Sequence, residues 1–176
     1  SLAMAGIGTY TKIEGFAFLP ITSFMMALTT FVSQNRGAKE YERARKGAHF
    51  GLVCSVSLAE TIGLLIALFA TPLMRLFVDD PQVIQYGVER AHYATILFFM
   101  LAYSHGVSAV LRGVGKSVVP MVVMLVCWCL VRVTLLTMLN MLFHNILFVY
   151  LIYPFTWSLS SITFFIYYHR VDWLHA

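Results

Sequence analysis

Residues 146–168 read ILFVYLIYPFTWSLSSITFFIYY and contain no charged side chain. An α-helix needs about 20 mostly apolar residues to cross the hydrocarbon core of a bilayer, so this stretch is long enough. Lipid offers no hydrogen-bond partners to the backbone, and a single spanning segment therefore has to satisfy its own amides as a helix. The stretch predicts a transmembrane helix near the end of the chain.

The rest of the chain has the same character. Its 176 residues are 60% hydrophobic and 11% charged, whereas soluble domains average about 45–50% apolar and about 25% charged residues. This composition predicts an all-α, polytopic transmembrane bundle of about five spans, with residues 1–176 as a single unit. The third span is the least apolar and has an amphipathic approach from Val83. The expected spans are residues 13–33, 51–69, 93–110, 118–143 and 146–168.

The connections between spans are short, and three of them carry local signals. Residues 34–47, QNRGAKEYERARKG, are expected to form a cytoplasmic amphipathic loop. Glu42 and Lys46 are four residues apart there, a spacing that predicts a short surface helix. Asp79 is expected to cap a helix whose first turn contains Pro81. His144 and Asn145 are expected to form a tight turn before the last span.

Basic residues predict how the bundle is oriented. Short loops rich in Lys and Arg stay in the cytoplasm, so the first loop, the third loop and the C-terminus are expected there, and the N-terminus outside. Such an outer N-terminus is explained if a helix precedes this chain. One side holds Arg36, Lys39, Arg43, Arg45, Lys46, Arg112, Lys116 and Arg170, and the other holds Lys12 and Arg75, with Arg90 near the third span.

Several classes of protein are disfavoured. The net charge of +4 comes largely from one loop, which is poor support for a nucleic-acid surface. The three cysteines lie inside apolar runs and predict neither a disulfide framework nor a metal site. No catalytic motif and no cofactor motif is found, so the chain is expected not to be an enzyme.

Charged groups inside spans are costly, and they are the first functional candidates. Glu60 and Arg132 lie at depths that differ by about 8 Å, and an ion pair between them is expected if their helices are neighbours. Such a pair can be structural or functional. Glu14 either lines an aqueous cavity or sits at the outer interface. Pro20 either exposes a carbonyl in a substrate or ion pathway or forms a kink that neighbouring helices absorb.

Histidine and methionine give weaker signals. His105 falls on the third span, where a titratable group can relay protons or simply pack. Met25 and Met26 are adjacent and suit a promiscuous binding surface, although methionine also faces lipid.

Five segments in order resemble the second half of the MATE-type multidrug and toxin extrusion transporters. They cover most of the chain. They are FAFLP at 16–20 with Ala27, QNRGA at 34–38 with RARKG after it, PLMRLFVDDPQVI at 72–84, VLRGVGKSVVP at 110–120, and the pair Arg132–Val133.

The resemblance implies a protein of twelve helices in two six-helix lobes around a central cavity, of which this chain would hold helices eight to twelve. The first lobe and the seventh helix would then lie outside this sequence. The acidic residue that some members carry midway in the tenth helix has no counterpart between Tyr93 and Val110. Coupling-ion residues therefore cannot be transferred from the family.

The expected function is secondary active efflux from the plasma or inner membrane. Drugs or organic cations, small and cationic or amphipathic, would leave in exchange for Na⁺ or H⁺. One alternative is a lipid-linked sugar flippase of a related fold. It is disfavoured because a pyrophosphate needs a strongly cationic cavity, whereas only Arg132 lies deep in a predicted span. The other is a membrane accessory protein or fragment without transport activity.

Overall fold

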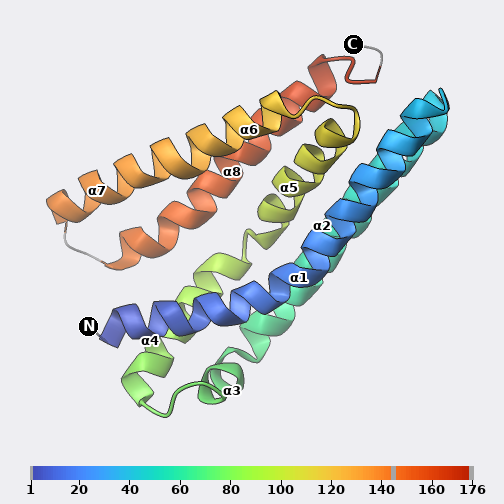
Figure 1. Ribbon diagram of the computed structural model, residues 1–176. Helices are drawn as coiled ribbons and strands as arrows, with labels where there is room; N and C mark the ends of the chain where they lie inside the picture. The colour runs from blue at the N-terminus through green and yellow to red at the C-terminus, as the bar shows by residue number, and fades with distance from the viewer. Residues whose placement is uncertain (1, 144–145, 175–176) are drawn as a thin grey trace.

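A computed structural model describes residues 2–143 and 146–174. All regular structure in these residues is helical, which confirms the predicted class (Figure 1). The predicted turn at His144 and Asn145 lies outside the described residues. The elements are α1 (Leu2–Gly37), α2 (Tyr41–Leu68), α3 (Ala70–Arg75), α4 (Pro81–Thr95), α5 (Phe98–Gly113), α6 (Val118–Met124), the π-helical η1 (Leu125–Val131), α7 (Arg132–Phe143) and α8 (Ile146–Arg170).

The number of spans agrees with the sequence. Helices α1, α2 and α8 and the continuous run Val118–Leu142 are each long and apolar enough to cross a membrane. Helices α4 and α5 together form a fifth candidate, bent by 56° at the break between them. The third expected span, residues 93–110, therefore corresponds to a broken helix rather than a straight one.

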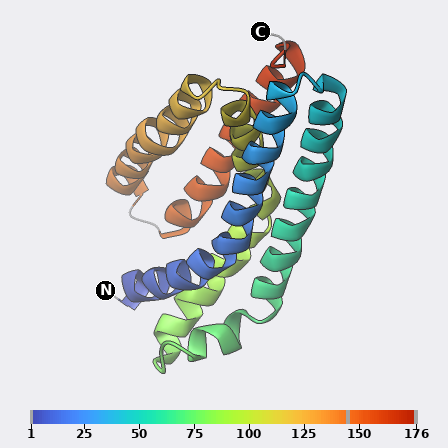
Figure 2. The same ribbon diagram turned by 45° about the vertical axis from the view of Figure 1, so that its right-hand side comes forward.

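Helix α1 is longer than the expected span. It has 36 residues, or ~54 Å at 1.5 Å per residue, whereas the hydrocarbon core is about 30 Å thick. Pro20 lies inside it and is exposed. A proline removes one backbone donor and bends a helix, and α1 changes direction in both Figure 1 and Figure 2.

The polar segment 34–47 is mostly helix. Its first residues end α1 and its last residues begin α2, so only residues 38–40 lie between the two helices. Lys46 Nζ lies 3.6 Å from Glu42 Oε2 on the first turns of α2, as their spacing predicted. Both side chains are about 80% exposed, and exposed pairs of this kind contribute little to stability.

The cap of α4 is Asp80, and the expectation that Asp79 caps this helix is wrong. The Asp80 carboxylate accepts hydrogen bonds from the amides of Gln82 and Val83, at 2.9 and 3.4 Å. Pro81 is the first residue of α4. Because proline fits the first helical position, the residue directly before it occupies the capping position.

Close backbone contact joins α1 to α4. A Cβ placed on Gly6 would lie 2.6 Å from the carbonyl oxygen of Val83 and 2.8 Å from Cβ of Tyr86. Small residues allow membrane helices to approach in this way. Helix α1 packs on α2, α4 and α5, while α8 packs on the other side of α5.

The run formed by α6, η1 and α7 packs mainly on α8 and lies at the edge of the bundle (Figures 1 and 2). Only 6% of the residues in its most apolar 18-residue stretch are buried. Residues of this run, together with residues of α1, α5 and α8, line the pocket described below.

The three basic segments lie at one end of the bundle. The α1–α2 turn, the α5–α6 turn and the described end of α8 are together in Figure 1, whereas the start of α1 and α3 lie toward the other end. Arg36 joins two of these segments by donating a hydrogen bond to the carbonyl of Val114.

Candidate functional site

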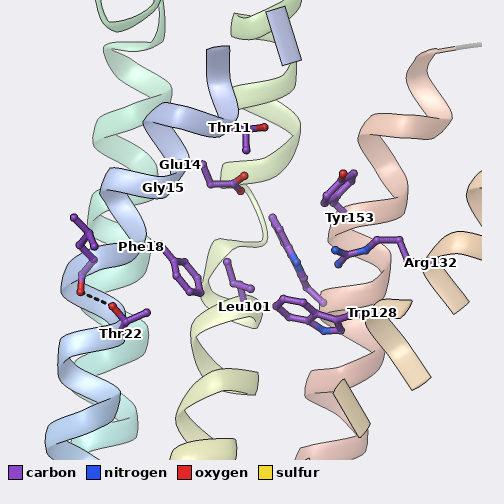
Figure 3. A pocket seen from close by; sticks show the side chains of 11 residues that line it. Thr11, Glu14, Gly15, Phe18, Thr22, Leu101, Trp128, Arg132 and Tyr153 are labelled. Atoms are coloured by element: carbon purple, nitrogen blue, oxygen red, sulfur yellow. Dashed lines mark hydrogen bonds between the residues drawn. The ribbon is translucent and has the colours of Figure 1, made fainter. Parts of the chain in front are cut away.

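An open pocket of about 330 Å³ lies between α1 on one side and α5, η1, α7 and α8 on the other. Figure 3 shows its side chains projecting from these elements toward a common space. Most of the wall is aromatic or aliphatic, and two side chains in it carry charge. The lining residues are Thr11, Glu14, Gly15, Phe18, Leu19, Thr22, Leu101, Trp128, Arg132, Tyr153 and Trp157.

One face of helix α1 packs against the neighbouring helices, and another face lines the pocket. Residues spaced by three or four positions share a helix face. Ile13, Ala17 and Ile21 are buried against the neighbouring helices, while the face with Glu14 and Phe18 lines the pocket. The glutamate therefore belongs to the cavity side of α1.

Glu14 is partly buried, and its carboxylate points into the pocket (Figure 3). Its Oε1 atom is enclosed and has no hydrogen-bond partner among the described residues. Burying a carboxylate oxygen without a partner is costly, so this atom is available to a ligand. The cations whose fields act on Glu14 are Arg90 and Arg132.

Arg132 enters the pocket from the opposite wall. Its Nε and Nη2 atoms both donate to Oγ1 of Thr156, at 3.1 and 2.6 Å. Its guanidinium carbon lies 5.0 Å from the ring of Trp128 and 4.6 Å from the ring of Tyr153. Aromatic faces attract cations at these distances, so the charge is held in place without an acid in contact.

The π-helical segment η1 directly precedes Arg132 and contains Trp128. Such wider turns are rare and occur frequently at functional sites. Here the segment aligns Trp128 with Arg132, one turn apart on the pocket side of the helix. No sequence pattern predicted this local change of winding.

Arg90 is a buried cation that the sequence pattern did not identify as a site residue. It is only 2% exposed, and its Nη1 donates to the carbonyl of Tyr150 at 3.3 Å. Its guanidinium carbon lies 4.1 Å from the same Tyr153 ring that Arg132 approaches. Helical spacing could have predicted its burial, because Arg90 shares the buried face of α4 with Val83, Gly87 and Ala94.

Glu60 does not line the pocket. Its Oε2 accepts a hydrogen bond of 3.1 Å from the amide of Phe99, at the break between α4 and α5. No ion pair joins Glu60 and Arg132 in the described part of the chain, since each has the different partners given above. The expected pairing is wrong because α2 packs on α4 and α5 while α7 packs on α8.

Pro20 does not line the pocket, although Leu19 beside it does. The hydroxyls of Thr22 and Ser23 both donate to the carbonyl of Leu19. The bend in α1 therefore lies next to the pocket wall, and Pro20 contributes through that bend.

A second pocket of about 480 Å³ adjoins the first, and both are lined by Phe18 and Thr22. Met25, Met26 and Arg112 line it further along α1 and α5. His105 lines the second pocket. Its ring centroid lies 5.1 Å from that of Phe18 and 5.0 Å from that of Trp128, so two edge-to-face contacts join it to side chains that line the first pocket.

Metal chemistry has no support within residues 2–143 and 146–174, where no group of three His, Cys, Asp or Glu side chains could hold an ion. Cys54, Cys127 and Cys129 are free thiols.

The chain matches a known family over most of its length. The family model MatE matches residues 1–138. The chain belongs to the MatE family. MatE proteins are membrane transporters and not enzymes, so the resemblance and the non-enzymatic assignment drawn from the sequence are confirmed.

Curated relatives agree with this assignment. A probable multidrug resistance protein NorM of Thermotoga maritima is 30% identical over 121 residues, which are 69% of this chain and 26% of the relative. The FAD transporter of Shewanella oneidensis is 30% identical over 84 residues, 48% of this chain and 19% of the relative. The probable multidrug resistance protein YoeA of Bacillus subtilis is 24% identical over 124 residues, 70% of this chain and 27% of the relative. The MatE chain thus spans about a quarter of the length of the first of these relatives.

Proposed function

We propose that this MatE chain forms one wall of the substrate cavity of a secondary active exporter. The exporter removes drug-like amphipathic compounds, including organic cations, in exchange for Na⁺ or H⁺. It acts in the plasma or inner membrane with the C-terminus in the cytoplasm. Two of the relatives above are named as probable multidrug resistance proteins, which supports this substrate class.

The observation that carries the proposal is the enclosed Oε1 of Glu14, which has no partner in the described chain and faces an aromatic pocket. A carboxylate in this situation gains more from a bound cation than one that already accepts hydrogen bonds. Glu14 is therefore the proposed acceptor of the coupling ion, or of a cationic group on the substrate. Because both compete for one carboxylate, binding of one releases the other.

The rest of the transporter closes the open side of the pocket. Lining residues from α1 and α7 face a pocket that is open on one side, and a second lobe preceding this chain would close it. Rocking of two lobes about a midplane site is the usual route to alternating access.

A flippase for lipid-linked sugars is the second candidate, and one observation favours it. The buried Arg90, which does not line the pocket, lies near the same aromatic ring as Arg132, so a second cation stands close to the cavity. The pocket's hydrophobic aromatic wall nevertheless suits a compact drug-like compound, and drug export remains the first proposal. A membrane accessory role without transport is the third reading.

Ethidium efflux tests the proposal. Cells that express the full-length product of the reading frame carrying this chain should lose preloaded ethidium faster than cells with empty vector. Collapsing the Na⁺ gradient or the pH gradient should remove the difference, and the gradient that matters identifies the coupling ion. Equal ethidium loss in both strains would count against drug export.

A further inference from the structure

The linings of the two adjoining pockets contain more cationic than anionic side chains. Glu14 is the acidic residue in their linings, whereas Arg132 lines the first pocket and Arg112 the second. Arg90 lines neither pocket, but its guanidinium carbon lies 4.1 Å from the ring of Tyr153. A compound with only a positive charge therefore meets more cations than anions along this wall.

Arg132 has unused hydrogen-bonding capacity on its cavity side. A guanidinium has five N–H donors, and the bonds to Thr156 use Nε and Nη2 on one edge. Within residues 2–143 and 146–174, Nη1 makes no hydrogen bond. Thr156 is completely buried and holds the guanidinium in one orientation, and Figure 3 shows the group directed into the pocket beside Tyr153.

We propose that Arg132 is the receptor for a carboxylate on the transported compound, so that the pocket selects aromatic compounds that carry an acidic group. The outer edge of the guanidinium binds the carboxylate through two parallel N–H donors. The ring system lies against Trp128 and Tyr153, which already flank Arg132. This inference rests on the proposed function, because it takes the pocket to be the substrate site.

Glu14 predicts a second feature of the transported compound, an amine. Glu14 stands on α1 and Arg132 on the opposite wall, with aromatic side chains between them (Figure 3). A compound that carries both an amine and a carboxylate would place the amine toward Glu14 and the carboxylate toward Arg132. Its amine competes with the coupling ion at Glu14, so the added acidic group is compatible with antiport.

Two rhodamine dyes isolate the carboxylate. One has a free benzoate, the other is its methyl ester, and both keep the same cationic ring system. Binding of each is measured by fluorescence polarisation to the purified full-length protein. We expect the free acid to bind about tenfold more tightly, equivalent to about 1.4 kcal/mol. Arg132→Gln should abolish that preference while leaving the ester bound, and Arg132→Lys should keep part of it.

Two further variants serve as comparisons. Thr137→Val, which removes an exposed hydroxyl from α7, should leave both affinities unchanged. Equal or tighter binding of the ester to the wild-type protein would overturn the inference while the export function stands. A preference that survives in Arg132→Gln but is lost in Arg112→Gln would also overturn it. Failure of both dyes to bind, together with no ethidium efflux, would overturn the proposed function and this inference with it.

Discussion

Glu14 and Glu60 are both acidic residues in membrane helices, and the structure gives them opposite situations. Glu60 on α2 accepts the amide of Phe99 inside the bundle. Glu14 on α1 has an enclosed oxygen without a partner in the described chain and faces a pocket. Glu60 accepts a hydrogen bond from a broken helix, whereas the enclosed oxygen of Glu14 has no partner among the described residues and is open to a ligand.

The comparison shows that the depth of a charge in a span does not decide its role. A broken helix leaves backbone groups that lipid cannot satisfy, so an acid at the break has a structural explanation. An acid at a cavity has no such explanation, because a neutral residue would cost less. The following substitutions separate the two cases.

The largest expected effect is on transport by Glu14→Gln. The substitution keeps the shape of the side chain and removes its charge, so coupled efflux should fall by at least about tenfold, as expected for losing a charged hydrogen bond. Efflux is measured per amount of folded protein in the membrane. Glu89→Gln is the matched control, because this acid accepts its hydrogen bond from Gln85 on the same helix and does not line the pocket. Full efflux in Glu14→Gln would remove Glu14 from the mechanism.

Glu60→Ala should instead act on stability. It leaves the Phe99 amide without its acceptor, at a cost of about 1–3 kcal/mol. Glu60→Gln keeps a neutral acceptor and should cost less. Thermal unfolding in detergent measures both, with efflux per folded molecule unchanged in Glu60→Gln. If the two variants unfold at the same temperature, the hydrogen bond to Phe99 is not what Glu60 contributes.

A smaller effect is expected from Thr156→Val. This change keeps the size of the side chain and removes the oxygen that accepts both bonds from Arg132. A lost hydrogen bond of about 0.5–1.5 kcal/mol corresponds to roughly two- to twelvefold weaker binding of the free-acid dye. Thr163→Val on the exposed side of α8 is the control. Equal loss in both variants would mean that Arg132 does not depend on Thr156.

The smallest effect is the coupling between Glu60 and Arg132. Since they have separate partners, the destabilisation of Glu60→Gln and Arg132→Gln should add within about 0.5 kcal/mol in the double variant. Denaturation of the three variants measures this. A coupling above that value would restore the ion pair that the sequence suggested.

The membrane class, the number of spans and the family were readable from the sequence, because apolar length and the segment from FAFLP to VLRGVGKSVVP are local patterns. The candidacy of Glu14 was also readable. The break between α4 and α5 was not, since Thr95, Ile96 and Leu97 include neither proline nor glycine. That break is stabilised by Glu60 from another helix, and no local pattern carries such information.

The partners of Arg132 were missed for the same reason. Thr156 and Tyr153 lie on α8, whereas Arg132 begins α7. A charge in an apolar run predicts that some partner exists. It does not identify the partner, because the packing of helices distant in sequence decides which groups meet.

Labelling with dicyclohexylcarbodiimide tests the difference between the two acids most directly. This apolar reagent modifies protonated carboxyl groups within membranes, and mass spectrometry of the digested full-length protein locates the adduct. We expect the adduct on Glu14, reduced when the free-acid rhodamine is bound, with Glu60 unmodified. An adduct on Glu60 with Glu14 unmodified, or labelling of Glu14 that bound dye does not change, would contradict the account.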